Sequence, residues 1–282
     1  MAGQLFAWFQ RLLPQHALSR LVGWLAGIEQ GAVKNILIRG FMVLFKVDMH
    51  EAAEPDPTAY PSFNAFFTRA LAPGTRSMPA DPAALACPVD GTISERAALE
   101  EGRLLQAKAF RYELTRLLGG EAPDELVHGS FATIYLAPWH YHRIHAPADA
   151  RLVEMRYLPG ALFSVNGATV GAVPRLFARN ERVACMFETG FGPMAVVLVG
   201  ALNVGSIATT WAGQVAPGPD RQASTWRYPE NGTGSVQLSR GEEMGRFNMG
   251  STVIVVLPER GPRFAPEIAA GRHVRLGQLL AS

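Results

Sequence analysis

The chain has 282 residues, of which 48% are hydrophobic and 18% are charged. This length and composition are typical of a folded protein with a sizeable core and exclude a disordered chain. The net charge of +2 is too small to indicate nucleic-acid binding.

The N-terminal 47 residues differ from the rest in charge. They hold five basic residues and one acidic residue, net +4, whereas the remaining 21 basic and 23 acidic residues give −2. Apolar residues recur at helical spacing across residues 4–47, with an interruption at Pro14, and predict helices. No run approaches the roughly 18–20 uncharged apolar residues needed to span a bilayer.

A basic helical region that also carries Trp8, Phe9, Trp24 and Phe41 favours a location in the membrane interface. Each Lys or Arg near an anionic lipid surface contributes about 1 kcal/mol of attraction. The alternative is that these helices pack on the protein's own core. We expect no secretory signal, because the N-terminus lacks a basic n-region and a cleavage site after its first apolar stretch.

A turn-rich segment, residues 54–58, separates this region from a part of the chain with strand patterns. We therefore predict an α+β protein with an N-terminal helical, membrane-associating region (1–53) and a β-rich, largely antiparallel catalytic body (54–282). A helix is predicted over 112–118, ending at Gly119. The clearest predicted strands, each short, apolar and β-branched, are 131–136, 195–199 and 252–257.

The two cysteines, Cys87 and Cys185, form neither a disulfide framework nor a zinc signature. We expect both to be small buried hydrophobic residues in a protein of the reducing cytoplasm.

Gly250, Ser251 and Thr252 lie at the mouth of the last predicted strand. Glycine tolerates backbone angles that other residues avoid, so the Gly-Ser bond can be held strained and open to attack by the serine hydroxyl. An ordinary turn entering a strand is the alternative. A G-x-S-x-G elbow is absent, so an α/β-hydrolase has little support.

Three of the seven histidines, His140, His142 and His145, fall within six residues. Histidine titrates near neutrality and serves as a general acid or base. Metal binding is a rival interpretation, but no Cys, Asp or Glu cluster nearby completes a zinc set. Asp90 enters a predicted turn and, with His145 and Ser251, makes a candidate nucleophile–base–orienter trio.

Taken together, these residues resemble the bacterial phosphatidylserine decarboxylase family. The resemblance includes Tyr-His-Arg-Ile-His at 141–145, Phe-Ser-Val-Asn at 163–166 and Glu-Met-Gly-Arg-Phe at 243–247 before Gly-Ser-Thr. Two departures are Met249, where many members have Leu, and His140, which lies outside the family pattern and receives no role. The other matching stretches are 13–24, 45–49, 63–69, 88–91, 106–108, 176–183, 191–195, 204–206 and 211–213.

The resemblance implies a self-cleavage relay of Asp90, His145 and Ser251. His145, oriented by Asp90, takes the proton of Ser251, whose oxygen attacks the carbonyl of Gly250 to give an ester. Elimination leaves dehydroalanine, which hydrolyses to a pyruvoyl group and ammonia. The chain becomes a β subunit of residues 1–250 and an α subunit of residues 251–282.

The resemblance also implies the second reaction. The pyruvoyl carbonyl forms a Schiff base with the amine of phosphatidylserine and acts as an electron sink while CO2 leaves, so no diffusible cofactor and no metal are needed. His142 is the expected proton donor of this step, which yields phosphatidylethanolamine. Phe163, Ser164 and Asn166 are the expected substrate-binding residues, with the phosphate as their ligand.

We accordingly expect a peripheral protein on the cytoplasmic face of the bacterial inner membrane. Its expected partners are phosphatidylserine, an anionic membrane surface and the other subunit cut from the same precursor. A homodimer is compatible with the sequence, and no nucleic-acid partner is expected. The alternatives are a pyruvoyl decarboxylase for a different serine-headed lipid or a soluble amino acid, a Ser-His-Asp hydrolase without self-processing, and a non-catalytic membrane-binding module.

Overall fold

The computed structural model describes residues 9–282 except 11, 108–109, 203–205, 219 and 250–251. Its helices are α2 (Gln15–Ala26), α3 (Gly31–Phe45), α4 (Phe63–Phe67), α5 (Leu114–Leu118), α6 (Asp124–Val127), α7 (Gly167–Val170) and α8 (Leu176–Arg179). Its strands are β1 (Leu85–Ala86), β2 (Gly91–Ala98), β3 (Arg103–Ala107), β4 (Phe110–Glu113), β5 (Ser130–Tyr135), β6 (Arg143–His145), β7 (Ala150–Leu158), β8 (Arg182–Thr189), β9 (Gly192–Val199), β10 (Ser206–Thr209), β11 (Gly213–Ala216), β12 (Ser224–Arg227), β13 (Gln237–Leu238), β14 (Glu243–Asn248), β15 (Thr252–Leu257), β16 (His273–Val274) and β17 (Leu279–Ala281).

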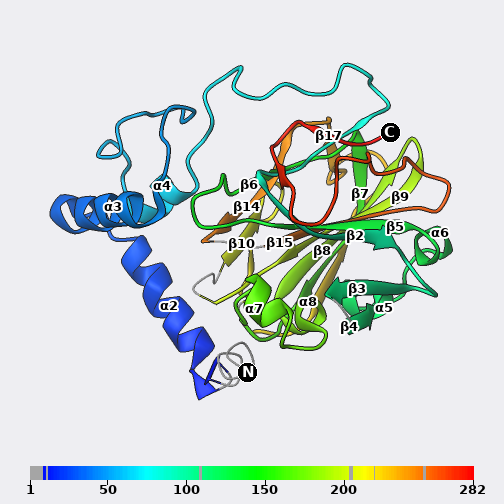
Figure 1. Ribbon diagram of the computed structural model, residues 1–282, viewed down its shortest axis with the longest axis horizontal. Coiled ribbons are helices and arrows are strands. Elements are labelled where there is room, and N and C mark those ends of the chain that lie inside the picture. The colour runs from blue at the N-terminus through cyan, green and yellow to red at the C-terminus, as the bar shows by residue number, and fades with distance from the viewer. Residues whose placement is uncertain (1–8, 11, 108–109, 203–205, 219, 250–251) are drawn as a thin grey trace.

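Helices α2 and α3 lie to one side of the sheets, in dark blue in Figure 1. Pro14 precedes α2, as expected from a residue that fits only the start of a helix. One side of α3 packs on α4, where the ring of Phe41 meets that of Phe63 edge-on with 5.1 Å between centroids. Among the described residues, no helix has the length and apolar character required to cross a membrane.

The outward sides of α2 and α3 carry uncovered apolar side chains. Trp24 is 66% exposed and Val43 is 81% exposed. The expectation that these helices pack on the protein holds in part, because one side of α3 packs on α4, and the apolar side chains left open to solvent are consistent with peripheral membrane association. The other exposed large apolar residues of the N-terminal region are Phe9, Leu12, Leu21, Ile36 and Leu44.

The body is built on a nine-stranded sheet with the order β12-β7-β8-β9-β15-β5-β2-β16, in which β13 also pairs with β7. A four-stranded sheet has the order β11-β10-β14-β6. The pairs within these sheets are antiparallel, which confirms the predicted α+β class. Two further pairs, β1-β17 and β3-β4, complete the described strands.

Strand β15 lies between β9 and β5, and all six of its residues are buried. Val253 and Val255 face one hydrophobic core, and Ile254 faces the other, on the opposite side of the sheet. A strand covered on both sides needs apolar residues throughout, which is why this one was visible in the sequence. Cys87 and Cys185 are both buried and free, as predicted.

The helix predicted over 112–118 is partly wrong. Tyr112 belongs to strand β4, and the helix starts at Leu114. Tyr112 is buried among the apolar residues of the second core, so tertiary packing decided its backbone conformation. The predicted end is right, because Gly119 adopts the left-handed conformation with φ 74° at the helix C-cap.

Candidate active site

Strand β14 belongs to the four-stranded sheet, and β15, the next strand along the chain, belongs to the nine-stranded one, so the chain passes from one sheet to the other after Met249. Met249 has a φ of 77°, a left-handed conformation that a side chain with a Cβ rarely adopts. Such a residue costs of order 1–3 kcal/mol and persists only where its surroundings impose it. The predicted cleavage site itself, Gly250 and Ser251, lies outside the described residues.

On the other side of this connection, Thr252 pairs with Tyr135 of β5 and with Val199 of β9. Its Oγ1 is buried and has no hydrogen-bond partner within the described part of the chain. An unpaired buried hydroxyl is costly, so it marks a position where a polar neighbour is expected.

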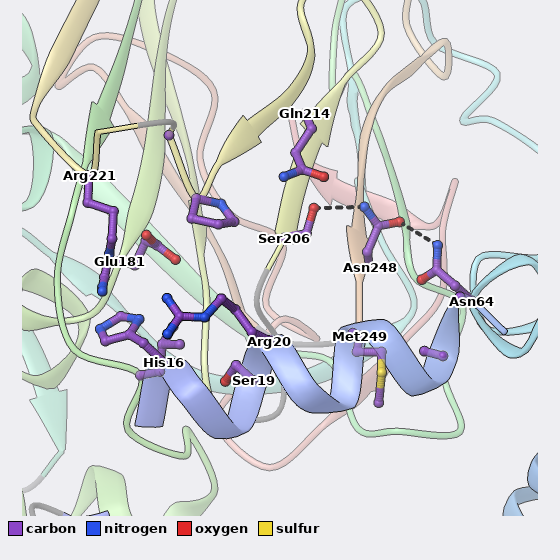
Figure 2. A pocket seen from close by; sticks show the side chains of 16 residues that line it. His16, Ser19, Arg20, Asn64, Glu181, Ser206, Gln214, Arg221, Asn248 and Met249 are labelled. Carbon is purple, nitrogen blue, oxygen red and sulfur yellow. Dashed lines mark hydrogen bonds between the residues drawn. The ribbon is translucent and has the colours of Figure 1, made fainter. Parts of the chain in front are cut away.

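A cavity of about 510 Å³ begins at Met249 and is shown in Figure 2. Its walls come from α2, α4, β10, β11, β14 and the loop after β11. This size is within the range of small-molecule sites. The lining residues are His16, Ser19, Arg20, Gly23, Ala26, Gly27, Asn64, Leu162, Glu181, Ser206, Gln214, Pro217, Gly218, Arg221, Asn248 and Met249.

One end of the cavity carries neutral polar groups. The amide of Asn64 donates to Asn248 Oδ1 at 3.2 Å, and the amide of Asn248 donates to the hydroxyl of Ser206 at 3.0 Å. Figure 2 shows this chain running from α4 across β14 to β10. It joins the N-terminal helices to the strand that leads into the cleavage site.

The other end is charged, with His16, Arg20, Glu181 and Arg221 drawn close together in Figure 2. Burial raises the pKa of Glu181, and this is opposed by its 2.6 Å hydrogen bond from Tyr157 and by the charge of Arg221. Burial, followed by the charge of Arg221, lowers the pKa of His16, which favours its neutral form. This end of the cavity is therefore suited to a negatively charged group.

The structure does not join Asp90 to His145 by a hydrogen bond within the residues it describes. Nε2 of His145 lies 2.9 Å from the hydroxyl of Tyr141, and Nδ1 lies 2.7 Å from the carbonyl oxygen of Gly241. Since that carbonyl can only accept, Nδ1 carries the proton. Burial lowers the pKa of His145, and the charge of Asp90 is among the smaller effects that raise it.

Asp90 has other partners in this conformation. Its Oδ2 accepts a hydrogen bond from Arg76 Nη2 at 2.6 Å, and its Oδ1 accepts one from the backbone N–H of Leu276 at 2.7 Å. The main chain nevertheless keeps it close to His145, because the N–H of His145 donates to the carbonyl of Pro88 at 3.0 Å. Asp90 and His145 thus lie in the same region, and their contacts with Ser251 stay a prediction.

His142 is fully buried, and burial lowers its pKa to about 3. Its Nε2 lies 3.3 Å from the carbonyl oxygen of Pro138, which accepts only, so Nε2 carries the proton. Nδ1 is then an unprotonated, buried nitrogen without a hydrogen-bond partner among the described residues. The backbone carbonyl of His142 accepts from Phe247, four residues before Ser251. His140 has no assigned role, and its Nδ1 accepts a hydrogen bond from the N–H of Ala137.

The predicted substrate-binding residues lie outside the lining of this cavity. Phe163 is buried, with the guanidinium of Arg179 over its ring. The N–H of Ser164 donates to Gln10, and the side chain of Asn166 caps α7. The bond to Gln10 ties the N-terminal segment to this loop, and substrate binding by the loop stays a prediction.

Known proteins match this chain over almost its full length. The profile described as phosphatidylserine decarboxylase matches residues 63–282, and one described as PSD matches residues 5–46. The chain belongs to the phosphatidylserine decarboxylase family. This family member is 50% identical to the phosphatidylserine decarboxylase proenzyme of Ectopseudomonas mendocina over 284 residues, covering 100% of this chain and 99% of the relative.

Other relatives carry the same description. The phosphatidylserine decarboxylase proenzyme of Marinobacter nauticus is 51% identical over 99% of this chain and 97% of its own. That of Polaromonas naphthalenivorans is 50% identical over 96% of this chain and 94% of its own.

Sequence reasoning on this family member missed the charged end of the cavity. Arg20 and Glu181 lie within stretches that carry the family resemblance, but no local pattern singled them out. The available signal was on α2, where His16, Ser19 and Arg20 place polar groups along one side of an otherwise apolar helix. A polar stripe on such a helix indicates that this side lines a site.

Proposed function

We propose that this chain decarboxylates phosphatidylserine, using a pyruvoyl group that it makes from its own Ser251. The observation that carries the proposal is the left-handed Met249, which lies directly before Gly250 and Ser251 and lines the cavity. Backbone strain next to a scissile bond favours its rearrangement, and the cavity holds a substrate against the residue that results.

For self-cleavage we propose that His145 is the general base for Ser251 and that Asp90 orients it. Support comes from the 3.0 Å backbone bond that brings His145 to Pro88, two residues from Asp90. Burial favours neutral His145, which is the form that accepts a proton. The relay can operate in two ways. Asp90 exchanges its hydrogen bond with Arg76 for one with His145, or it keeps that bond and its negative charge acts on His145 from a distance.

A pyruvoyl carbonyl at position 251 supplies an electron sink for breaking the bond to the substrate carboxylate. Thr252, the next residue in the chain, would offer this group a hydroxyl that has no partner among the described residues, and Met249 and Asn248 line the cavity. We assign His142 to proton transfer. Because its Nδ1 is unprotonated, His142 would first accept a proton from the substrate ammonium group and would then give it to the substrate carbon that has lost CO2.

The two chains produced by cleavage stay together. β15 belongs to the 251–282 chain, yet it pairs along its length with β5 and along five residues with β9 of the 1–250 chain. β16 and β17 of the same chain pair with β2 and β1. We therefore expect the chains to copurify and to separate only in denaturant.

We further propose that the exposed apolar residues of α2 and α3 seat the protein on the cytoplasmic face of the bacterial inner membrane, on anionic lipid. The net charge of +4 over residues 1–47 supports attraction to such a surface. The possibility of a homodimer is tested separately, by light scattering of the purified protein.

The deciding experiment is the intact mass of the purified protein with and without borohydride. The wild type should appear as two chains, with the 251–282 chain carrying a reducible carbonyl at its N-terminus. Ser251→Ala should remain one chain and release no CO2 from phosphatidylserine. An active but uncleaved wild type would contradict the mechanism and favour a hydrolase, while decarboxylation of free serine at a comparable rate would point to a soluble substrate.

A further inference from the structure

Helix α2 has two functionally different sides. Leu21 and Trp24 point away from the body and are exposed. Ser19, Arg20 and Gly23, at helical spacing on another side, line the cavity that begins at Met249. The helix that offers apolar side chains to a membrane is therefore also a wall of the candidate active site.

Two arginines line the charged end of that cavity. Arg20 comes from α2 and Arg221 from the loop between β11 and β12, about 200 residues later in the chain. Both lie beside His16 in Figure 2, and both charges act on its pKa, that of Arg221 more than that of Arg20 and both after burial. Neither guanidinium has a hydrogen bond or an ion pair with the described part of the chain.

Two arginines face a single carboxyl group here, so this end of the cavity has an excess of positive charge. Glu181 is the one acid among the described residues that line the cavity. It is buried, and its carboxylate accepts a hydrogen bond from Tyr157; burial raises its pKa, while this bond and the charge of Arg221 lower it. Two unpaired guanidinium groups in a concave site are a ready recognition element for a phosphate or carboxylate.

We propose that Arg20 and Arg221 bind the phosphodiester of the lipid headgroup, an inference that rests on the proposed function. The substrate offers two anions, the phosphodiester and the carboxylate. The carboxylate becomes neutral CO2, so an arginine on it would stabilise the substrate more than the transition state and slow the reaction. The phosphodiester keeps its charge throughout, so binding it holds the substrate without opposing the chemistry.

This assignment makes α2 a substrate-binding element as well as a membrane contact. The lipid tails remain in the bilayer on the outer side of α2, while the headgroup lies between α2 and the loop that carries Arg221. Because phosphatidylethanolamine retains the same phosphodiester, the product should compete with the substrate at these two arginines.

The test uses dihexanoyl phosphatidylserine dissolved as monomers, so that membrane binding plays no part. Arg20→Gln and Arg221→Gln should each raise KM by about 10- to 100-fold with little change in kcat, as expected for the loss of a charge-assisted bond made equally in the ground and transition states. Arg20→Lys should recover part of the loss. The matched control is Arg103→Gln, at an exposed arginine of β3 outside the cavity lining.

Glycerophosphocholine provides a second readout, because it carries a phosphodiester but no primary amine to react with the carbonyl. It should inhibit the wild type and Arg103→Gln competitively and should lose about tenfold or more in affinity for both cavity variants. The phosphodiester assignment would be overturned if Arg20→Gln and Arg221→Gln showed the same KM and the same inhibition as the wild type and Arg103→Gln. A loss confined to kcat would also overturn it. Cleavage and a reducible carbonyl are measured in every variant, and their absence from the wild type would instead contradict the proposed function.

Discussion

The imidazole of His142 lies against the ring of Phe67, with 4.0 Å between the ring centroids and 20° between the planes. Phe67 belongs to α4, which packs on α3 of the N-terminal region, so the position of α3 bears on the cover of this histidine. Burial, to which this ring contributes, is the main reason that the pKa of His142 falls to about 3. The contact therefore links the placement of the N-terminal helices to the protonation state of a proposed catalytic residue.

This contact predicts an acid-sensitive fold. The unfolded chain takes up a proton on His142 near its ordinary pKa of 6.5, whereas the folded chain resists protonation down to about pH 3. Stability should therefore fall as the pH drops below 6.5, by up to about 1.4 kcal/mol per pH unit from this group. Urea midpoints between pH 7 and pH 4.5 should show a weaker pH dependence in His142→Leu, and an unchanged one in the control His128→Leu at an exposed position. Equal slopes in His142→Leu and wild type would contradict the prediction.

The two histidines should separate maturation from catalysis. His145→Ala removes the proposed base, worth typically 10²–10⁴-fold, and should remain uncleaved. His142→Ala should cleave and carry a reducible carbonyl, yet decarboxylate poorly. One gel and one CO2-release assay on both variants check this, and the reverse pattern would exchange the two roles.

Asp90 presents a choice between two roles, as orienter of His145 and as partner of Arg76. We expect Asp90→Ala to remain uncleaved. Arg76→Gln removes the ion pair but keeps the carboxylate and its bond to Leu276, so it should mature and show only a lower thermal midpoint. If Arg76→Gln also stays uncleaved, the ion pair is the requirement and the relay role of Asp90 is wrong.

The strain at Met249 should speed self-cleavage. Met249→Ala keeps the left-handed backbone under strain, whereas Met249→Gly relieves it, because glycine adopts a φ of 77° without a Cβ penalty. Both changes remove the side chain, so their ratio isolates the backbone effect. We expect Met249→Gly to mature about tenfold more slowly than Met249→Ala, consistent with 1–2 kcal/mol of released strain. Time courses of intact mass measure the ratio, and a ratio near one would exclude a contribution from strain.

Membrane binding should depend on the outward side of α2. Trp24→Ser removes a side chain that is 66% exposed and should weaken binding to anionic vesicles by about tenfold or more. Trp226→Ser on β12, also exposed, is the matched control and should leave binding unchanged. Vesicle sedimentation measures both, and self-cleavage should be normal in each. Equal binding by the two variants would place the membrane contact elsewhere.

Local pattern was sufficient for the central strand and for the helical N-terminus. Strand β15 was predicted to the residue, because a strand buried on both sides must be apolar throughout and cannot tolerate a turn. The break at Pro14 was equally visible, since proline does not fit a helix interior. Tyr112 was assigned to the wrong element because its burial in the second core, which no local pattern reports, decided its conformation.

The sequence by itself determined the family, and it predicts the cleavage dipeptide and the residues of the relay, because these depend on motifs of a few neighbouring residues. Only the tertiary structure decided which side chains share a space. It placed Arg76 and Leu276 on Asp90, Phe67 on His142, and Arg20 opposite Arg221 across one cavity. Such pairs are made by sheet pairing and helix packing between distant segments, so no spacing along the chain contains them.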